Sequence, residues 1–427
     1  MSISLKTAGQ GSIEAWFPRG LVCNGADILS APVTKEGLSP LRISWERGRV
    51  RNIEFVEYPD QPITKLLLPR LVEPHAHIDK GFTWEKFPNL GGTYEGALEA
   101  NMREHKLRTP ESVRLRAEKA LQRALKNGLR AIRTHIDSFG SIGNQSWDVL
   151  NELKIEWQDL IELQCVALVP LEYWSSTEGS LLARKVANQD GLLGGVLVPP
   201  FNRNQVRSDL LNLIRLANSL GCAIDLHIDE ASKSPAEGLK HLIRVLDCIA
   251  CNVPITCSHS SSMALLSNRE IKHLANRLAN HNVSVIALPL TNAWLLGRHT
   301  RRTPVVRPLA PIKQLQQAGI SVAVGGDNVQ DPWFPLGNLD PISLISSSMP
   351  ITQLAPWERL GLSAYTTSAA VIMGLEWDGS LKRDAPADFI VIEAKNWSEA
   401  ISATLGRQKI VNGNWLHDDS LSVKEDS

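Results

Sequence analysis

Five side chains of the types that bind transition metals stand at the ends of predicted strands: His75, His77, His227, His259 and Asp327. Each of them follows a short apolar run. Imidazole and carboxylate groups in this combination suit Zn²⁺ or Fe²⁺. One such residue alone would mean little, but a set at corresponding ends of successive strands predicts one metal centre at the mouth of a barrel. Such a centre indicates a hydrolytic enzyme.

The elements that must position these side chains form a repeated helix–strand unit. Thr109 has the type and place of an N-cap, Pro110 stands at the first helical position, and Gly128 ends the predicted helix. A strand-like run, 129–135, follows it. The unit then recurs, with helices predicted over 207–220, 236–250, 268–281 and 311–318 and strands over 222–227, 253–259, 283–290 and 321–327.

Three further apolar runs, 65–72, 163–169 and 193–198, bring the predicted strands to eight. Eight strands separated mostly by helices favour an α/β fold with a parallel (β/α)8 barrel over an open doubly wound sheet. No GxGxxG motif opens any of the helices, so a dinucleotide-binding fold has no direct support. Active sites of such barrels lie at the C-terminal ends of the strands, which is where the five side chains stand.

The two ends of the chain have a different character. Residues 11–62 and 376–415 contain short strand-like runs separated by turn signals. Two β-rich ends that flank a barrel can pair with each other. The sequence therefore predicts a small β-sandwich domain from residues 1–66 and 375–427, and a catalytic barrel domain from residues 67–374.

The charge balance and the cysteines bear on partners and compartment. The chain has 427 residues with 45 Lys+Arg and 45 Asp+Glu, so nothing favours nucleic acid or an anionic membrane. Residues 1–19 hold no continuous apolar run of the signal-peptide kind. Six cysteines show no disulfide framework, and the pair Cys248 and Cys251 is interpreted as structural. We therefore expect a cytoplasmic protein.

Several motifs together resemble those of the amidohydrolase superfamily and, within it, the cytosine deaminase-like branch. The resemblance spans nearly the whole chain, and its most specific parts are an HxxE motif and a DPWxPLG stretch. The matching segments are Glu73–Asp79, Arg133–Asp137, His227–Glu230, Ser258-His259, Leu296–Arg298 and Asp327–Gly337.

The resemblance implies a mononuclear centre with His75, His77, His227 and Asp327 as metal ligands. Members with two metals carry a bridging carboxylated lysine at the end of strand 4, and residues 194–201 of this chain contain no lysine. Lys80 follows the first motif, at a position that cannot bridge two metals. We interpret it as a loop or substrate-side residue.

The residue types then predict a reaction. Neutral imidazoles leave a divalent ion acidic enough to ionise a bound water near neutral pH, with a pKa of about 7 for zinc. Asp327 can take that proton, and the hydroxide attacks an sp² carbon that bears an amine. Glu230 can protonate the ring nitrogen and then the leaving amine, which is worth roughly 10²- to 10⁴-fold in rate. The resemblance gives His259 the role of polarising the attacked group or holding the hydroxide.

The expected substrate contacts depart from those of the cytosine deaminases, in which a glutamine just after strand 3 grips the pyrimidine. Leu171 stands there in this chain, or Pro170 if the match shifts by one residue. Neither side chain can make that contact, so cytosine is expected to be a poor substrate unless another residue, such as Glu172, grips the ring.

Three further residues complete the predicted site. Asn328 replaces the second aspartate after strand 8, as in the similar N-isopropylammelide isopropyl amidohydrolase branch, and it exchanges an acceptor-only group for a donor and an acceptor. Trp333 is expected to line the pocket. His135 is either a support behind the metal ligands or a structural residue.

The leading hypothesis is a metal-dependent hydrolase that deaminates cytosine or a related amino-substituted N-heterocycle. Alternatives are an N-alkyl-hydroxytriazine (ammelide-type) amidohydrolase, an isocytosine- or creatinine-type deaminase and, more remotely, a metal-free relative without enzymatic activity. The expected cofactor is one divalent ion per chain, Zn²⁺ or Fe²⁺. The expected partner is a small-molecule N-heterocycle, with no nucleic acid and no membrane, and a homo-oligomer is left open.

Overall fold

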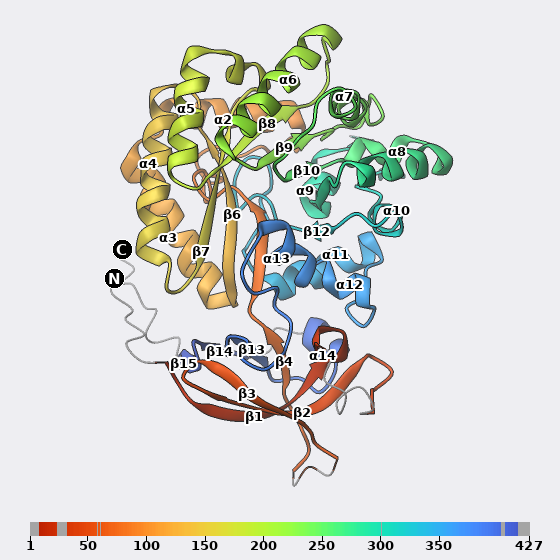
Figure 1. Ribbon diagram of the computed structural model, residues 1–427. Coiled ribbons are helices and arrows are strands. Elements are labelled where there is room, and N and C mark those ends of the chain that lie inside the picture. The colour runs from red at the N-terminus through yellow and green to blue at the C-terminus, as the bar shows by residue number, and fades with distance from the viewer. Residues whose placement is uncertain are drawn as a thin grey trace.

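The computed structural model describes residues 8–23, 32–57, 59, 61–299, 301–402 and 406–416. Its larger sheet has eight parallel strands that pair in chain order (Figure 1). They are β5 (Leu71–Ala76), β6 (Leu129–Asp137), β7 (Glu162–Leu168), β8 (Leu192–Leu197), β9 (Ile224–Ile228), β10 (Ile255–His259), β11 (Ser284–Ala287) and β12 (Val322–Val324). A parallel bridge from Ala76 to Asp327 connects the two edges. The predicted (β/α)8 barrel is confirmed.

Helices connect these strands and surround the sheet (Figure 1). They are α2 (Tyr94–Leu107), α3 (Pro110–Asn127), α4 (Gly140–Trp157), α5 (Thr177–Asn188), α6 (Arg203–Leu220), α7 (Glu237–Leu246), α8 (Asn268–Asn280), α9 (Pro289–Leu295), α10 (Ile312–Gln317), α11 (Pro341–Thr352), α12 (Arg359–Ser363) and α13 (Thr367–Met373), with the short 3-10 helices η2 (Leu171–Ser175) and η3 (Ser261–Leu265). The N-cap prediction for α3 is confirmed, because Thr109 Oγ1 accepts a hydrogen bond from the Ser112 N–H at 3.2 Å. Gly128 ends this helix at φ 90°, in the left-handed region that glycine enters without strain.

A second, mixed sheet of seven strands combines both ends of the chain, at the bottom of Figure 1. In spatial order these are β15 (Asn414–Leu416), β14 (Arg407–Val411), β13 (Phe389–Ile392), β4 (Leu66–Pro69), β1 (Gly11–Pro18), β2 (Leu38–Glu46) and β3 (Arg49–Phe55), with η1 (Arg19–Leu21) and α14 (Trp397–Ser402) beside them. The predicted pairing of the two β-rich ends is therefore present, as one continuous hydrogen-bonded sheet. The domain boundaries at 66/67 and 374/375 stay a prediction, and β4 straddles the first of them.

The first predicted strand, 65–72, is corrected by the structure. It divides into β4, which belongs to the small sheet, and β5, which begins the barrel. The break falls at Arg70, whose backbone N–H donates to the Asp388 carbonyl across the small sheet. The barrel strand therefore runs on to Ala76, and His75 lies inside it.

The seventh predicted strand, 283–290, is also too long. The strand β11 ends at Ala287, and α9 begins at Pro289, which occupies the first turn of that helix. Proline lacks the N–H that a ladder needs and has a φ suited to a helix start, so it favours this change of element.

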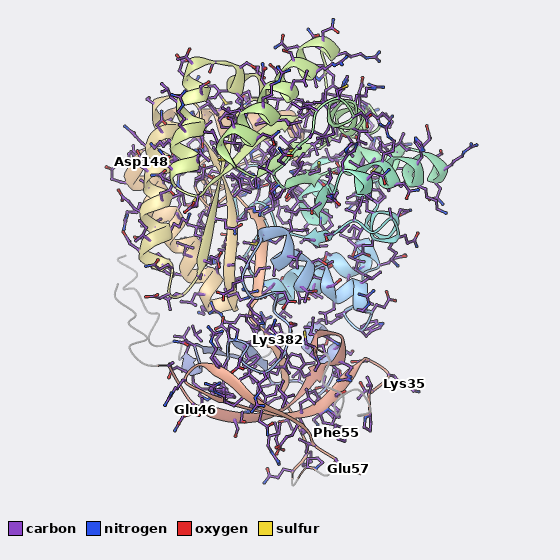
Figure 2. The ribbon with its side chains drawn as sticks, in the orientation of Figure 1. Lys35, Glu46, Phe55, Glu57, Asp148 and Lys382 are labelled. Atoms are coloured by element: carbon purple, nitrogen blue, oxygen red, sulfur yellow. The ribbon has the colours of Figure 1, made fainter. Side chains whose placement is uncertain are left out.

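Charged side chains project outward from both parts of the molecule. In Figure 2, Asp148 points away from α4 and Glu46 from the end of β2, and both are exposed. All six cysteines lie in the described part of the chain and are free. Among the described residues, no helix combines the length and the apolar character needed to cross a membrane.

Arg70 connects the small sheet to the barrel. Its guanidinium is buried, pairs with Asp388 at 3.2 Å and donates to the carbonyls of Leu129 and Leu160. Because these acceptors belong to different parts of the molecule, one side chain satisfies backbone groups of the barrel while it neutralises a carboxylate of the small sheet.

Replacement of Arg70 by alanine should therefore destabilise the fold. It leaves a carboxylate and two backbone carbonyls without a buried donor, and we expect the free energy of unfolding to fall by about 3 kcal/mol. Equilibrium unfolding in urea measures this change.

The matched control is Arg42→Ala, which removes an exposed ion pair with Glu14 on the small sheet. Exposed pairs contribute about 0–1 kcal/mol, so this variant should unfold near the wild-type midpoint. Equal losses in the two variants would contradict a special role for Arg70.

Candidate metal centre

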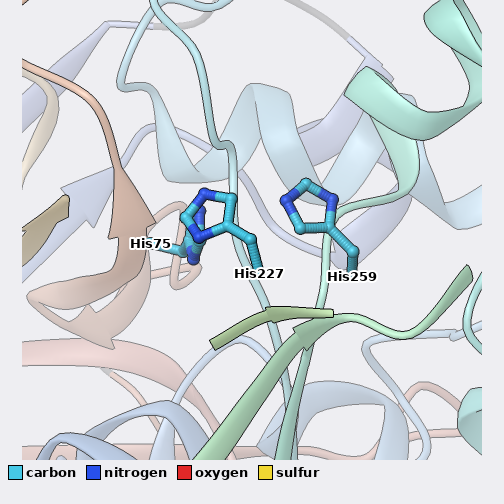
Figure 3. Close-up of side chains that lie close together, drawn as sticks. All are labelled: His75, His227 and His259. Carbon is cyan, nitrogen blue, oxygen red and sulfur yellow. The ribbon is translucent and has the colours of Figure 1, made fainter. Parts of the chain in front are cut away.

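The ends of three strands bring the four predicted ligands to one place. His75 lies in β5 and His77 follows it, His227 lies in β9, and Asp327 follows β12. All four are buried, with side chains no more than 6% exposed. His259 ends β10 beside them. Figure 3 shows that the side chains of His75, His227 and His259 lie close together.

The backbone is strained where two of these residues leave their strands. His259 has φ 69° and Asp327 has φ 67°, both in the left-handed region that residues with a side chain seldom enter. Such a conformation costs on the order of 1–3 kcal/mol and persists only where the surroundings enforce it. The fold therefore holds these two residues at the rim in an unfavourable conformation, which is common at functional sites.

The distances between the ligand atoms suit a shared ion. His77 Nε2 lies 3.1 Å from His227 Nε2 and 3.4 Å from Asp327 Oδ1. His75 Nε2 lies 3.6 Å from the same Oδ1. Ligand atoms that are each about 2.0–2.2 Å from one zinc ion lie a little over 3 Å apart.

Unpartnered buried atoms point to the same conclusion. His75 Nε2 and both carboxylate oxygens of Asp327 are buried without a hydrogen bond. A buried polar atom without a partner is costly, and imidazole nitrogens and carboxylate oxygens gathered in this way are typical ligands of a divalent transition metal. The residues present therefore suit one such ion.

Two ligand imidazoles are held in a defined tautomer. Ser258 Oγ donates to Asp225 Oδ1 at 2.8 Å, so its oxygen can accept the Nδ1–H of His75 at 2.9 Å. His77 Nδ1 lies 3.2 Å from the His135 carbonyl, which can only accept. Each ring thus carries its proton on Nδ1 and presents the Nε2 lone pair to the centre, as outer partners of metal ligands commonly ensure.

The hydrogen bonds that orient His75 continue beyond Ser258 to Asp225 and Arg133. Arg133 Nη1 donates to Asp225 Oδ2 at 2.9 Å. Burial raises the pKa of Asp225 to about 6, and the guanidinium of Arg133 counteracts that rise. A carboxylate held in this way keeps Ser258 oriented toward His75.

His135 lies directly behind the ligands. Its ring centroid is 3.9 Å from that of His75, and its Nε2 is 3.8 Å from Asp225 Oδ2. With His75 and Asp225 it forms a second buried group of metal-type atoms. Both of its ring nitrogens lack a hydrogen bond. The structure thus places His135 against the ligand cluster, and its role as support or structural residue stays open.

Burial favours the neutral form of three imidazoles, those of His75, His227 and His259. Desolvation lowers the pKa of His75 and of His227 well below the ordinary value, and neighbouring imidazoles lower both further. Burial likewise lowers the pKa of His259 to about 4. Neutral imidazoles are the form that binds a metal.

Glu230 stands beside His259 and Asn292. Its Oε1 lies 3.4 Å from His259 Nδ1 and 3.5 Å from Asn292 Nδ2. Burial, followed by the nearby charge of Asp327, raises the pKa of Glu230 well above the usual range. A carboxyl group in this environment favours its protonated form, which suits proton delivery.

A cavity of about 500 Å³ opens over the cluster. Lys80, Asn328 and Trp333 line it, as do Glu230, His259 and the ligands His77, His227 and Asp327. Lys80 is buried and donates to Asp137 at 3.1 Å, and Asn328 donates to Asp331 at 2.8 Å. The structure thus places all three residues at the cavity wall, and their contact with a substrate stays a prediction.

The structure does not bring Leu171 and Glu172 to this cavity. Leu171 is buried in the apolar core and Glu172 is exposed at the start of η2. The chain turns into η2 directly after β7, so Val169 and Pro170 form the wall at this point. Pro170, the alternative from a one-residue shift, thus lies at the cavity wall, whereas Leu171 does not.

Several site residues escaped the sequence interpretation. Asn292 and Asp225 support His259 and His75, and Asn101 lines the cavity from α2. A signal existed for Asp225, because a carboxylate inside the apolar run 222–227 demands a buried partner. Asn101 gave no comparable signal on its helix.

Replacement of Ser258 by alanine should weaken metal binding. The Nδ1–H of His75 then loses its acceptor and the ring loses its fixed orientation, so we expect the dissociation constant for Zn²⁺ to rise about 10- to 100-fold. Competition with a chromophoric chelator measures it. The control is Ser219→Ala on the exposed face of α6, and loss of zinc affinity in both variants would remove the orienting role of Ser258.

Comparisons with known proteins agree with this arrangement. The amidohydrolase family model matches residues 170–414. Pterin deaminase of Rhizobium rhizogenes is 32% identical over 358 residues, which cover 83% of this chain and 81% of that protein. N-isopropylammelide isopropyl amidohydrolase of Pseudomonas sp. is 24% identical over 368 residues, 84% of this chain and 87% of that one. The structure of 5-methylcytosine deaminase from Klebsiella pneumoniae superimposes with a TM-score of 0.81 at 24% identity, and covers 95% of this chain and 98% of that chain. The chain belongs to the amidohydrolase family.

Proposed function

We propose that this protein hydrolytically deaminates an amino-substituted N-heterocycle, with His75, His77, His227 and Asp327 holding one divalent ion, Zn²⁺ or Fe²⁺. The observation that carries the proposal is a buried set of metal-type atoms without partners, open to a cavity that also contains Glu230. An ion bound there lowers the pKa of a water molecule toward neutrality and so provides the nucleophile.

Asp327 and Glu230 divide the proton transfers between them. Asp327 lies at the centre with unpartnered oxygens, where it can accept the proton of the attacking water. Glu230 lines the same cavity and holds a proton because burial disfavours its charge. It can deliver that proton to the ring nitrogen next to the attacked carbon. The proton that Asp327 accepted can then pass to the departing amine, while Glu230 regains a proton from the added hydroxyl group as the ring carbonyl forms.

His259 can act as a neutral hydrogen-bond donor. Asn292 Nδ2 approaches His259 Nδ1 at 3.0 Å, and the amide group donates to that nitrogen. The ring proton is then on Nε2, which is buried and has no partner. A donor placed in this way can polarise the attacked carbon–nitrogen group or orient the water.

A pterin is favoured as the substrate over cytosine. The relative that shares 32% of its residues with this chain is a pterin deaminase. The wall after β7 consists of Val169 and Pro170, which offer no side-chain clamp for a pyrimidine amide. The cavity of about 500 Å³ is also large for a one-ring substrate.

An N-alkylammelide is the second candidate. The observation in its favour is Asn328, whose amide nitrogen is committed to Asp331 and whose side chain lines the cavity. A relative that is 24% identical is an N-isopropylammelide isopropyl amidohydrolase. Such a substrate would release an alkylamine in place of ammonia.

A substrate screen separates these candidates. We expect the zinc-loaded protein to release ammonia from pterin at a kcat/KM above those for cytosine, isocytosine and creatinine. Release of isopropylamine from N-isopropylammelide, detected by mass spectrometry, would favour the second candidate. A protein that holds its metal and converts none of these compounds would contradict the proposed reaction.

The Glu230→Gln variant tests the proton-transfer role. Glutamine keeps the shape of the side chain but has no acidic proton to deliver, so turnover should fall roughly 10²- to 10⁴-fold while metal content, measured by mass spectrometry, stays near one ion per chain. The control is Glu172→Gln, which alters an exposed carboxylate outside the cavity and should leave turnover unchanged. Near wild-type turnover in Glu230→Gln would remove this residue from the mechanism.

A further inference from the structure

One face of helix α2 forms a wall of the cavity away from the metal ligands. Tyr94, Leu98, Asn101 and Met102 all line the cavity. Their spacing of four, seven and eight residues places them on one side of a helix. The active site therefore includes a helical surface as well as the strand ends.

Asn101 presents an unused acceptor on this surface. Its side chain is 6% exposed, and its Nδ2 donates to Asp137 Oδ2 at 3.4 Å. A carboxylate can only accept, so this contact fixes which end of the amide faces Asp137. The other end, Oδ1, is buried without a hydrogen bond. Buried acceptors of this kind are costly, and a ligand N–H would satisfy it.

Asp137 is itself held firmly, which makes Asn101 rigid. Lys80 Nζ and Arg108 Nη2 both contact its carboxylate, at 3.1 and 3.0 Å. These cations hold the pKa of Asp137 well below its usual range against the opposing effect of burial. Arg108 also pairs with Glu104, one turn after Asn101 on α2. The amide is thus positioned before any ligand arrives.

Apolar side chains beside Asn101 lack cover. Leu98 is 46% exposed and Met102 is 38% exposed, although both line the cavity. Trp333 lies against Tyr94 with 5.0 Å between ring centroids, and its Nε1 is a buried donor without a partner. This end of the cavity therefore offers apolar surface, an aromatic face, one donor and one acceptor.

We propose that the cavity recognises a fused two-ring N-heterocycle, and that Asn101 Oδ1 accepts an N–H of that ring system while Leu98 and Met102 cover its face. The proposal rests on the proposed deaminase function and assigns its specificity to α2. A one-ring substrate at the metal end leaves the apolar stripe uncovered. An alkyl substituent covers the stripe but leaves the Asn101 acceptor without a donor.

The test compares pterin with cytosine in the zinc-loaded protein. Wild type should show a kcat/KM for pterin at least about tenfold above that for cytosine. Asn101→Leu retains the branched shape of the side chain and removes the acceptor, together with the N–H that reaches Asp137. We expect it to lower kcat/KM for pterin about tenfold or more, chiefly through KM, and to reduce the pterin-to-cytosine ratio.

The control for α2 is Leu107→Ala, an exposed position at the last residue of the same helix that does not line the cavity. It should retain the wild-type ratio. A wild type that prefers cytosine, or an Asn101→Leu variant that loses both activities by the same factor, overturns the proposal.

A binding measurement separates this proposal from the proposed function. Pterin fluorescence reports binding to the Glu230→Gln protein, and adding Asn101→Leu should raise the dissociation constant about tenfold or more. If wild type releases no ammonia but this difference in binding is found, the reaction is wrong and the recognition site stands. If ammonia is released and the double variant binds pterin as tightly as Glu230→Gln, the recognition site is wrong and the reaction stands.

Discussion

The central constraint in this molecule is the burial of metal-type side chains that leave several of their polar atoms without a partner. His77 and His227 approach each other through Nε2 atoms at 3.1 Å, and His75 and Asp327 present unpartnered atoms to the same point. Because His75 and His77 carry their protons on Nδ1, their Nε2 atoms offer only lone pairs to that point. A cation is the partner that relieves this arrangement, so the fold tolerates a local cost that ligand binding removes.

The backbone contacts that close the barrel also bring two of the predicted ligands together. The Asp327 N–H donates to the His75 carbonyl at 3.0 Å, and the bridge from Ala76 to Asp327 connects the first and last strands. Two ligands are therefore brought together by the hydrogen bond that joins the sheet edges. The left-handed conformation of Asp327 then turns the chain away from the strand. A barrel that failed to close here would also lose its metal centre.

The sequence predicted the rim well because strand ends carry strong local signals. His75 and His77 stand two apart at the end of an apolar run, and His227 and Asp327 each end another, so periodicity and barrel topology sufficed to bring them together.

The prediction from the sequence failed where the outcome depends on how the chain leaves a strand. Pro69 and Arg70 interrupt the apolar run 65–72, but they do not show that the chain passes there from one sheet to the other. The turn into η2 after β7 moves Leu171 into the core and leaves Pro170 at the wall. The position of Asn101 in the site could not be predicted from the sequence. It depends on a contact with Asp137, which lies 36 positions further along the chain.

The strand ends and the surrounding helices and turns contribute different parts of the proposed site. The predicted metal ligands lie at strand ends, whose spacing is fixed by the backbone hydrogen bonds of the barrel. The surfaces that contact the rest of a substrate come from α2 and from the turns after β7 and β8, which the barrel ladder does not constrain. The charge network around Asp137 joins the two parts, because Lys80 follows the metal-binding strand β5 while Arg108 follows α2. Changes on α2 can therefore alter which ring system is accepted without moving the ligands, whereas changes at Asp137 act on both.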